Sequence, residues 1–303
     1  MKYIFIVNGN AGKRNSLQLV KDQIPNLREP IDYDIHETVG PKDALSFVQN
    51  YCKEHIDDDV CFVACGGDGT INEVSFGMMG SKNKKLGVLA YGSGNDLIKY
   101  YPDKDFKSIQ KLVDGTISRI DMLKATNKDT GEVRYSINAI NFGFDSVVCS
   151  KANEIKEKGG KNAYPKGVVH GILTGRFNKI DVELDGEKAT NGKLLLCTLA
   201  NHKYVGGSYC CAPRSKNNDG LIEACLFTPI PLIKFIILMG PYQRGEHLEK
   251  APAIVGNHMV YKQIKQAHVY SDKDFELCLD GEMFVGKDFL VDILPSSLDF
   301  IVP

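Results

Sequence analysis

The chain has 303 residues, of which 43% are hydrophobic and 25% are charged, and its formal net charge at pH 7 is −1. This composition is typical of a soluble globular protein with one large core or two domains of ordinary size. The near-neutral charge argues against a protein that mainly binds nucleic acid, because phosphate contacts require a basic surface.

The apolar run at residues 1–7 is too short for a signal peptide and is expected to form a first strand. No stretch approaches the ~20 uncharged apolar residues that span a bilayer. The 9 cysteines are scattered, and several lie within apolar runs, which favours reduced and buried thiols. We therefore expect a cytoplasmic protein, and peripheral contact with a membrane surface stays open.

The first 120 residues alternate between predicted strands and predicted helices. Short turns between alternating elements are typical of a mostly parallel sheet that is covered by helices. The predicted strands are residues 3–7, 33–37, 60–65 and 86–91, and the predicted helices are residues 16–24, 42–52, 71–79 and 106–114.

After residue 118 the pattern changes to strands that are separated by turns, which indicates a second, mainly β domain. Three helices are expected there, at 150–158, 165–174 and 231–239. The expected domains are residues 1–122 (α/β) and 123–288 (β), with 289–303 returning to the first. The expected strands are residues 120–125, 134–142, 179–185, 193–201, 220–227, 266–271 and 275–280.

Two glycine-rich turns follow two of the predicted strands of the first domain. They are Gly66-Gly67-Asp68-Gly69-Thr70 and Gly92-Ser93-Gly94-Asn95-Asp96. In an open parallel sheet the carboxyl ends of the strands form the ligand crevice, and glycine lets backbone N–H groups approach phosphate oxygens. An aspartate in each turn is explained if a divalent cation accompanies the phosphate. The alternative is a turn whose aspartate only caps the next helix.

Three further segments carry candidate groups. The turn Asn8-Gly9-Asn10-Ala11-Gly12-Lys13 is not a P-loop, since its glycine and lysine spacing differs from that motif. Asp121 lies at the expected domain junction. Asp280-Gly281-Glu282 carries two carboxylates, although Asp-Gly is also a common hairpin signal, and the residues alone favour the hairpin.

Together these segments resemble the diacylglycerol kinase family, specifically the bacterial soluble lipid kinases. The resemblance covers nearly the whole chain and also includes Ile140–Asp145, Ala212–Leu221 and Arg244–His247. It implies an N-terminal Rossmann-like α/β nucleotide-binding domain and a C-terminal β-sandwich that contributes to the lipid site. It also implies transfer of the γ-phosphate of ATP to a lipid hydroxyl, with diacylglycerol as the leading acceptor.

The resemblance assigns roles to individual positions. It implies that Glu282 is the proton acceptor, with Asp280 beside it, and that Asp68, Asp96 and Asp121 surround the catalytic Mg²⁺. It places a second, structural Mg²⁺ at Lys216, Asp219 and Leu221, where Asn218 replaces one of the family's two acids. The residues implied around ATP are Asn8, Gly12, Lys13, Thr38, Gly66, Gly67, Asp68, Gly69, Thr70, Asn72 and Ser93.

Two other functions fit part of the sequence. An NAD kinase carries the same Gly-Gly-Asp-Gly-Thr motif, but the Asn-Glu motif expected after its second strand is replaced here by Gly92–Asp96. A nucleotide-binding regulator without catalysis is disfavoured because Asp68, Asp96, Asp121 and Glu282 are all present. The expected partner is a lipid at the membrane surface, with no nucleic acid, and a homodimer stays open.

Overall fold

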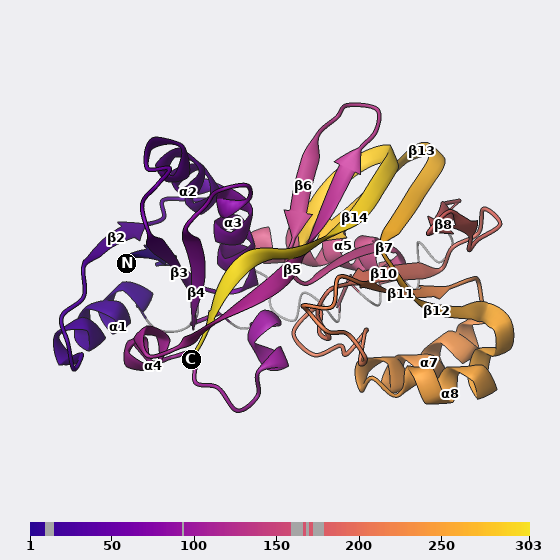
Figure 1. Ribbon diagram of the computed structural model, residues 1–303. Coiled ribbons are helices and arrows are strands. Elements are labelled where there is room, and N and C mark those ends of the chain that lie inside the picture. The colour runs from indigo at the N-terminus through magenta and orange to yellow at the C-terminus, as the bar shows by residue number, and fades with distance from the viewer. Residues whose placement is uncertain (10–14, 93, 159–165, 168–169, 172–178) are drawn as a thin grey trace. The chain divides into compact units, whose positions relative to one another are not determined.

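The computed structural model describes residues 1–9, 15–92, 94–158, 166–167, 170–171 and 179–303 (Figure 1). The chain divides into two compact units, residues 1–121 together with 296–303, and residues 122–295. The first unit therefore ends one residue before the expected boundary. The returning segment begins at Ser296, whereas we expected it to begin at residue 289.

The first unit is built on a parallel sheet whose strands are nearly continuous apolar runs. Its strands are β1 (Lys2–Val7), β2 (Tyr33–Glu37), β3 (Val60–Gly66) and β4 (Lys84–Ala90), in the order β4-β3-β1-β2. The end of β14 (Glu282–Val302) adds to β4 in parallel, with Phe300 opposite Leu86. Such runs are expected where a sheet is covered on both faces.

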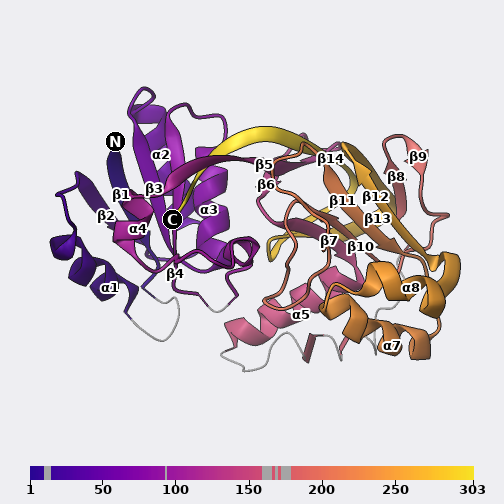
Figure 2. The same cartoon turned by 60° about the horizontal axis from the view of Figure 1, so that its bottom comes forward.

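Helices cover both faces of this sheet. Figure 2 shows α1 (Ser16–Gln23) and α4 (Ile109–Val113) on one face, and α2 (Asp43–Glu54) and α3 (Asp68–Met78) on the other. Val20 of α1 and Leu112 of α4 pack against Tyr3, Phe5 and Val7, which alternate along β1. The short 3₁₀ helices η1 (Ile24–Asn26) and η2 (Leu97–Tyr100) complete the described helices of this unit.

The second unit is dominated by antiparallel pairing. The strand order is β12-β11-β10-β7-β13-β14, and β8 adds to β13. The chain enters it along β5 (Thr116–Asn127), which pairs with β6. The other strands are β6 (Val133–Ser136), β7 (Ala139–Gly143), β8 (Asp181–Leu184), β9 (Glu187–Lys188), β10 (Leu196–Ala200), β11 (Ile222–Phe227), β12 (Met259–Ile264) and β13 (Gln266–Leu279).

Two apolar layers enclose the central strands of the second unit. On β10, Cys197 and Leu199 belong to a core shared with β8, β13 and β14, whereas Leu196 and Ala200 belong to a core shared with the helices. These helices are α5 (Phe144–Glu157), α7 (Leu232–Gln243) and α8 (His247–Val255), followed by η3 (Gly256–His258). Alternate residues of one strand therefore serve two different cores.

Several predicted elements differ from the structure. The single strand expected at 134–142 is two strands, β6 and β7, which pair with different neighbours. The strands expected at 266–271 and 275–280 form one strand, β13, with an irregularity between Tyr270 and Phe275. The sequence analysis missed α8, β12 and β9, and most of the helix expected at 165–174 lies outside the described residues.

The state of the thiols follows the expectation from their apolar surroundings. All 9 cysteines are free, and all except Cys149 are buried. None of the helices in the described part of the chain is long and apolar enough to cross a membrane.

Candidate active site

The carboxyl ends of three adjacent strands gather candidate nucleotide-binding residues in the first unit. Asn8 follows β1, Thr38 follows β2, and the glycine-rich turn follows β3. The Asn8 side-chain amide donates to Thr70 Oγ1 at 3.4 Å, and the Thr38 N–H donates to the Val7 carbonyl at 2.9 Å. This edge is where open parallel sheets bind their ligands.

The two glycine-rich turns are fastened to each other. The Gly66 carbonyl accepts the N–H groups of Tyr91 and Gly92 at 3.0 and 2.9 Å. A Cβ on Gly92 would overlap the backbone of Gly67, and a Cβ on Gly66 would overlap the Thr70 side chain. Close packing within the protein therefore explains Gly66 and Gly92 without any ligand.

Gly69 is different, because no contact with the described residues requires a glycine there. A Cβ on Gly69 would meet no atom of the described residues within 4 Å, and its backbone is not in the left-handed region. Glycine costs stability relative to alanine in a helix. The open space lies in the first turn of α3, where backbone N–H groups lack helical acceptors and favour an anion. This is the position at which a phosphate would occupy the space that a side chain would fill.

Asp68 and Asp96 lie next to each other at this edge. Asp68 Oδ1 accepts the Asp96 backbone N–H at 2.6 Å. Burial raises the pKa of Asp68, and the neighbouring Asp96 carboxylate raises it further, while the N–H groups of Asp96 and Asn95 oppose the shift. A pair of carboxylates held in this way favours a cation between or beside them.

Asp96 also has a cationic partner, since Lys99 Nζ lies 2.7 Å from Asp96 Oδ1. The turn itself is held by Asn95, which adopts a positive φ of 53° and donates its side-chain amide to the Gly92 carbonyl at 2.8 Å. Lys99 carried no role in the sequence analysis, and its only signal was its position three residues after Asp96.

Asp121 is fully buried in the first unit and holds its returning segment. Its Oδ1 accepts the Ser296 N–H at 2.7 Å, and Ser296 has a positive φ of 48°. Within the described ranges, no group of three or more His, Cys, Asp or Glu side chains is placed to hold a metal ion. The structure thus brings Asp68 and Asp96 together and gives Asp121 a contact that stabilises the fold.

The remaining nucleotide-site predictions divide into two groups. Asn72 is buried in α3, and its Oδ1 has no hydrogen-bond partner within the described structure. Gly12, Lys13 and Ser93 lie outside the described residues.

Asp280 and Glu282 lie in the second unit and have different surroundings. Asp280 and Gly281 have φ values of 49° and 99° and form the two-residue turn between β13 and β14, in which Leu279 pairs with Glu282. The Asp280 carboxylate accepts the backbone N–H groups of Ile137, Asn138 and Ala139 at 2.7, 3.1 and 3.0 Å. Burial raises the pKa of Asp280 to about 6, although these donors oppose the shift.

The Asp280 carboxylate is therefore committed to the connection between β6 and β7. It accepts these N–H groups at the point where the single strand expected from the sequence is divided into β6 and β7. Glu282, in contrast, is exposed at the start of β14. The Gly281 carbonyl between them accepts the Asn153 side-chain amide of α5 at 2.8 Å, which fixes the turn.

The residues expected at a second Mg²⁺ form an ordinary turn. Asp219 Oδ1 accepts the Leu221 N–H at 3.1 Å, and Gly220 between them has a φ of 71°. Lys216 and Asp219 are both exposed. One carboxylate oxygen of Asp219 is thus already engaged by the backbone.

Comparison with known families shows which family the chain belongs to. Residues 2–125 match the diacylglycerol kinase catalytic domain, and residues 138–302 match the YegS C-terminal NAD kinase beta sandwich-like domain. The chain belongs to the diacylglycerol kinase catalytic-domain family, with a YegS-type C-terminal domain. The expected architecture, an N-terminal α/β domain followed by a β-sandwich-like domain, is confirmed.

Relatives in this family match over nearly the full chain. A protein of Klebsiella pneumoniae named "Probable lipid kinase YegS-like" is 28% identical over 99% of this chain and 95% of its own length. One crystal structure from Bacillus anthracis has a TM-score of 0.73 at 20% identity, over 100% of this chain and 97% of that one. A second, titled as a diacylglycerol kinase, has a TM-score of 0.66 at 16% identity, with the same coverage.

The fold also extends to NAD kinases. An Archaeoglobus fulgidus NAD kinase in complex with ATP has a TM-score of 0.51 at 11% identity, over 99% of this chain and 92% of that chain. At this identity the likeness concerns the fold alone. The family match to the diacylglycerol kinase catalytic domain therefore carries more weight than this structural likeness.

Proposed function

We propose that the protein is a lipid kinase that transfers the γ-phosphate of ATP to a lipid hydroxyl, with diacylglycerol as the leading acceptor and phosphatidic acid as the product. The observation that carries the proposal is the open space over Gly69, beside the Asp68–Asp96 pair, in a chain of the diacylglycerol kinase catalytic-domain family.

The first unit supplies the nucleotide-binding groups in this proposal. The first N–H groups of α3 bind phosphate oxygens over Gly69, and the Thr70 hydroxyl and the Asn8 amide border the same edge. The buried Asn72 Oδ1 is an acceptor that the described protein leaves without a donor. By resemblance Gly12, Lys13, Thr38 and Ser93 belong to the same site.

Asp68 and Asp96 are the groups that would hold Mg²⁺, because carboxylate oxygens suit this ion and the two residues lie next to each other at this edge. When bound, Mg²⁺ neutralises charge on the phosphoryl group in transfer. Asp121 is placed by resemblance in the same network, and its own contact supports the returning segment.

In the second unit we assign proton acceptance to Glu282. Its carboxylate is exposed, whereas the Asp280 carboxylate is engaged by three N–H donors. A primary alcohol is a poor nucleophile, and a carboxylate that takes its proton in the transition state typically accelerates transfer by ~10²–10⁴-fold. Asp280 positions the turn that carries Glu282.

A lipid acceptor implies work at a membrane surface, and α7 offers a suitable face. Ile233, Ile236 and Ile237 are 64%, 52% and 54% exposed, and the exposed Lys234 lies among them. Isoleucines at these positions share one side of a helix, and a lysine beside them suits anionic headgroups. We propose that this face makes the peripheral contact.

The test is transfer of radiolabelled γ-phosphate from ATP to a panel of diacylglycerol micelles, sphingosine, other lipid alcohols and NAD, with and without Mg²⁺. We expect label in a lipid, in a reaction that EDTA stops. Label in NAD alone would assign the chain to NAD phosphorylation, and no label anywhere would favour a regulator without catalysis. The Asp103→Asn variant, which changes an exposed acid of the same unit, is the matched control for Asp68→Asn.

A further inference from the structure

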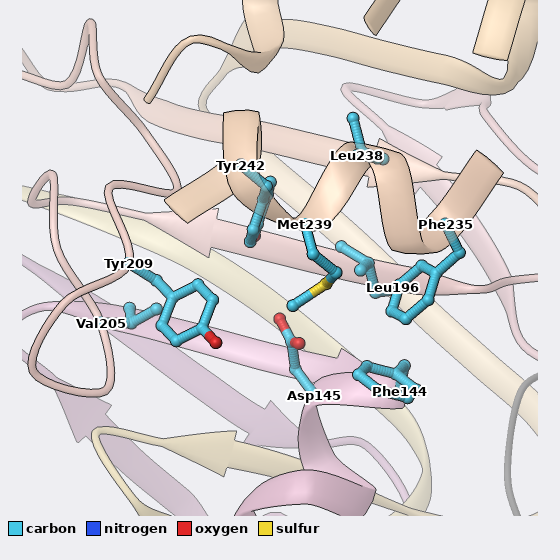
Figure 3. Close-up of a pocket in the computed structure, with 9 residues that line it drawn as sticks. All are labelled: Phe144, Asp145, Leu196, Val205, Tyr209, Phe235, Leu238, Met239 and Tyr242. Carbon is cyan, nitrogen blue, oxygen red and sulfur yellow. The ribbon is translucent and has the colours of Figure 1, made fainter. Parts of the chain in front are cut away.

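One face of α5 carries Asp145, Cys149 and Asn153, which follow one another at intervals of four residues. Residues spaced in this way are neighbours along a helix. Asp145 is directed toward Met239 in a small pocket against α7, which has room for about one water molecule (Figure 3). This face of α5 therefore turns toward the interior of the second unit. The other side chains that line the pocket include Leu196, Val205, Tyr209, Phe235, Leu238 and Tyr242.

The other two residues of this face contact the end of β13 and the turn that follows it. The Asn153 side-chain amide donates to the Gly281 carbonyl at 2.8 Å. One helical turn earlier, the Cys149 sulfur accepts a hydrogen bond from the Cys278 thiol. Cys278 faces α5 because its two neighbours in β13 belong to the core on the opposite face of the sheet. Two thiols from distant parts of the sequence thus lie in contact.

The two thiols of this pair differ in exposure. Cys149 is partly exposed, whereas Cys278 and the remaining cysteines are buried. The hydrogen bond to Cys149 and burial raise the pKa of the Cys278 thiol well above its usual range, although the Gly281 N–H, which donates to its sulfur, opposes the shift. An oxidant therefore reaches Cys149 first, while Cys278 stays protonated beside it. An accessible cysteine next to a second thiol is a common arrangement of reversible redox sites.

We propose that Cys149 and Cys278 form a reversible disulfide when the protein meets hydrogen peroxide. The Cys149 thiolate attacks one peroxide oxygen, the O–O bond breaks, and hydroxide leaves and is protonated to water, so that Cys149 becomes a sulfenic acid. The Cys278 thiol then loses its proton and attacks the Cys149 sulfur, the S–O bond breaks, and a second water leaves. Two thiols and one peroxide thus give one disulfide and two waters.

The disulfide acts on the turn that carries Glu282. In the reduced protein the Gly281 N–H donates to the Cys278 sulfur and the Gly281 carbonyl accepts the Asn153 amide. Two sulfurs in a hydrogen bond must approach further before they can bond covalently, so α5 and the end of β13 move together and both contacts of Gly281 change. This consequence rests on the proposed function, in which Glu282 accepts the proton, and it predicts that oxidation lowers turnover.

The experiment treats the full chain with hydrogen peroxide, counts thiols after denaturation and measures the intact mass. We expect the wild type to lose a pair of thiols and about 2 Da, with Cys149 and Cys278 joined in a peptide map, and dithiothreitol to restore both thiols. Cys149→Ser should form no such bond. Cys52→Ser, at a buried cysteine of the first unit, is the matched control and should still form it.

A second variant traps the intermediate of this reaction. Cys278→Ala removes the thiol that resolves the sulfenic acid, so dimedone should label Cys149 in this variant more strongly than in the wild type. Equal labelling in the two proteins would overturn the proposal. Wild-type protein that keeps all its thiols, that joins another pair of cysteines, or that converts Cys149 to a sulfinic acid instead of a disulfide would also overturn it.

The thiol count does not depend on kinase activity, so this inference and the proposed function can fail separately. A disulfide in a protein that transfers no phosphate would support the redox pair and contradict the kinase. In an active kinase, oxidation should lower kcat of the wild type about tenfold or more and leave kcat of Cys149→Ser unchanged. Equal kcat in the oxidised and reduced wild type would overturn the effect on Glu282.

Discussion

The acidic turns of the first unit and the apolar pocket of the second unit surround a carboxylate in opposite ways. Asp68 accepts the N–H of the neighbouring turn, and a second carboxylate lies beside it. Among the described residues that line its pocket, Asp145 has apolar side chains and tyrosines around it. The first arrangement places two carboxylates where a cation can bind them, whereas the second favours the protonated, uncharged form of the acid.

The sharpest test of this difference is Asp68→Asn. The amide keeps an oxygen for the Asp96 N–H but lacks the charge, so we expect the fold to persist and phosphoryl transfer to fall by about 10³-fold or more. The measurement is the rate of label transfer at saturating ATP, with Asp103→Asn as the control. Activity near that of wild type would refute the cation-binding assignment.

The next largest effect is expected for Glu282→Gln, which distinguishes the role of Glu282 from that of Asp280 in the β13–β14 turn. We expect kcat to fall by ~10²–10⁴-fold with ATP affinity unchanged. Asp280→Ala, by comparison, leaves three backbone N–H groups without their acceptor, and should lower the free energy of unfolding by about 2–4 kcal/mol. An unchanged kcat in Glu282→Gln would move the proton acceptor elsewhere.

Gly69→Ala tests whether a ligand occupies the space at the start of α3. Alanine meets no atom of the described residues there and should stabilise the helix by about 0.5–1 kcal/mol, while its methyl group should weaken ATP binding by about 10-fold or more. Thermal unfolding and ATP titration measure the two effects. Gly92→Ala is the contrasting variant, since its Cβ overlaps Gly67 and should destabilise the fold. ATP affinity that Gly69→Ala leaves intact would contradict the phosphate site.

The pH dependence of stability tests the surroundings of Asp145. Its pKa is about 7 in the fold against 3.8 for an unperturbed aspartate, so the folded state binds this proton more tightly than the unfolded state. The contribution of Asp145 to the free energy of unfolding is therefore fully present below pH ~4 and is lost as the pH rises through 7. Asp145→Asn removes the dependence, so the free energy of unfolding of this variant should rise relative to that of the wild type between pH 5 and pH 8, by up to about 3 kcal/mol. Urea unfolding at the two pH values measures this, and parallel pH profiles would place Asp145 in a polar environment.

The smallest expected effect concerns the outer face of α7, whose inner face forms the pocket. Ile236→Ser should weaken sedimentation with anionic phospholipid vesicles by about 3- to 30-fold, because a partly inserted isoleucine contributes part of its transfer free energy. Ile56→Ser, at an exposed isoleucine of the first unit, is the matched control. Equal losses in both variants would indicate nonspecific adsorption.

The sequence predicts the first unit well because its signals are local. The apolar runs of β1, β3 and β4 and the glycine-rich turns after β3 and β4 are contiguous in the chain, so periodicity and turn chemistry suffice. The break between β6 and β7 depends instead on Asp280, about 140 residues away, whose carboxylate collects the intervening N–H groups. No local sequence pattern indicates a contact with such a distant residue.

Other features could not be predicted from the sequence either, because they depend on contacts between distant parts of the chain. The sequence contains Gly69 and Gly92 in similar turns, and only the fold distinguishes Gly92, which close packing requires, from Gly69, which no contact with the described residues requires. Pro252 inside α8 obscured that helix. Asp145 stands in a segment that carried the family resemblance, but its apolar surroundings come from α7 and β10, which are distant in sequence.

The last strand has a consequence for the order of events during synthesis. Phe300 and Ile301 are buried in the core of the first unit, and Phe300 stacks on Phe106 at 5.9 Å. The first unit is therefore incomplete until these residues leave the ribosome, whereas residues 122–295 are already available to fold. We expect stalled nascent chains that end near residue 295 to resist protease in the second unit and to be cleaved in the first, so that the unit that begins the chain is the last to complete its fold.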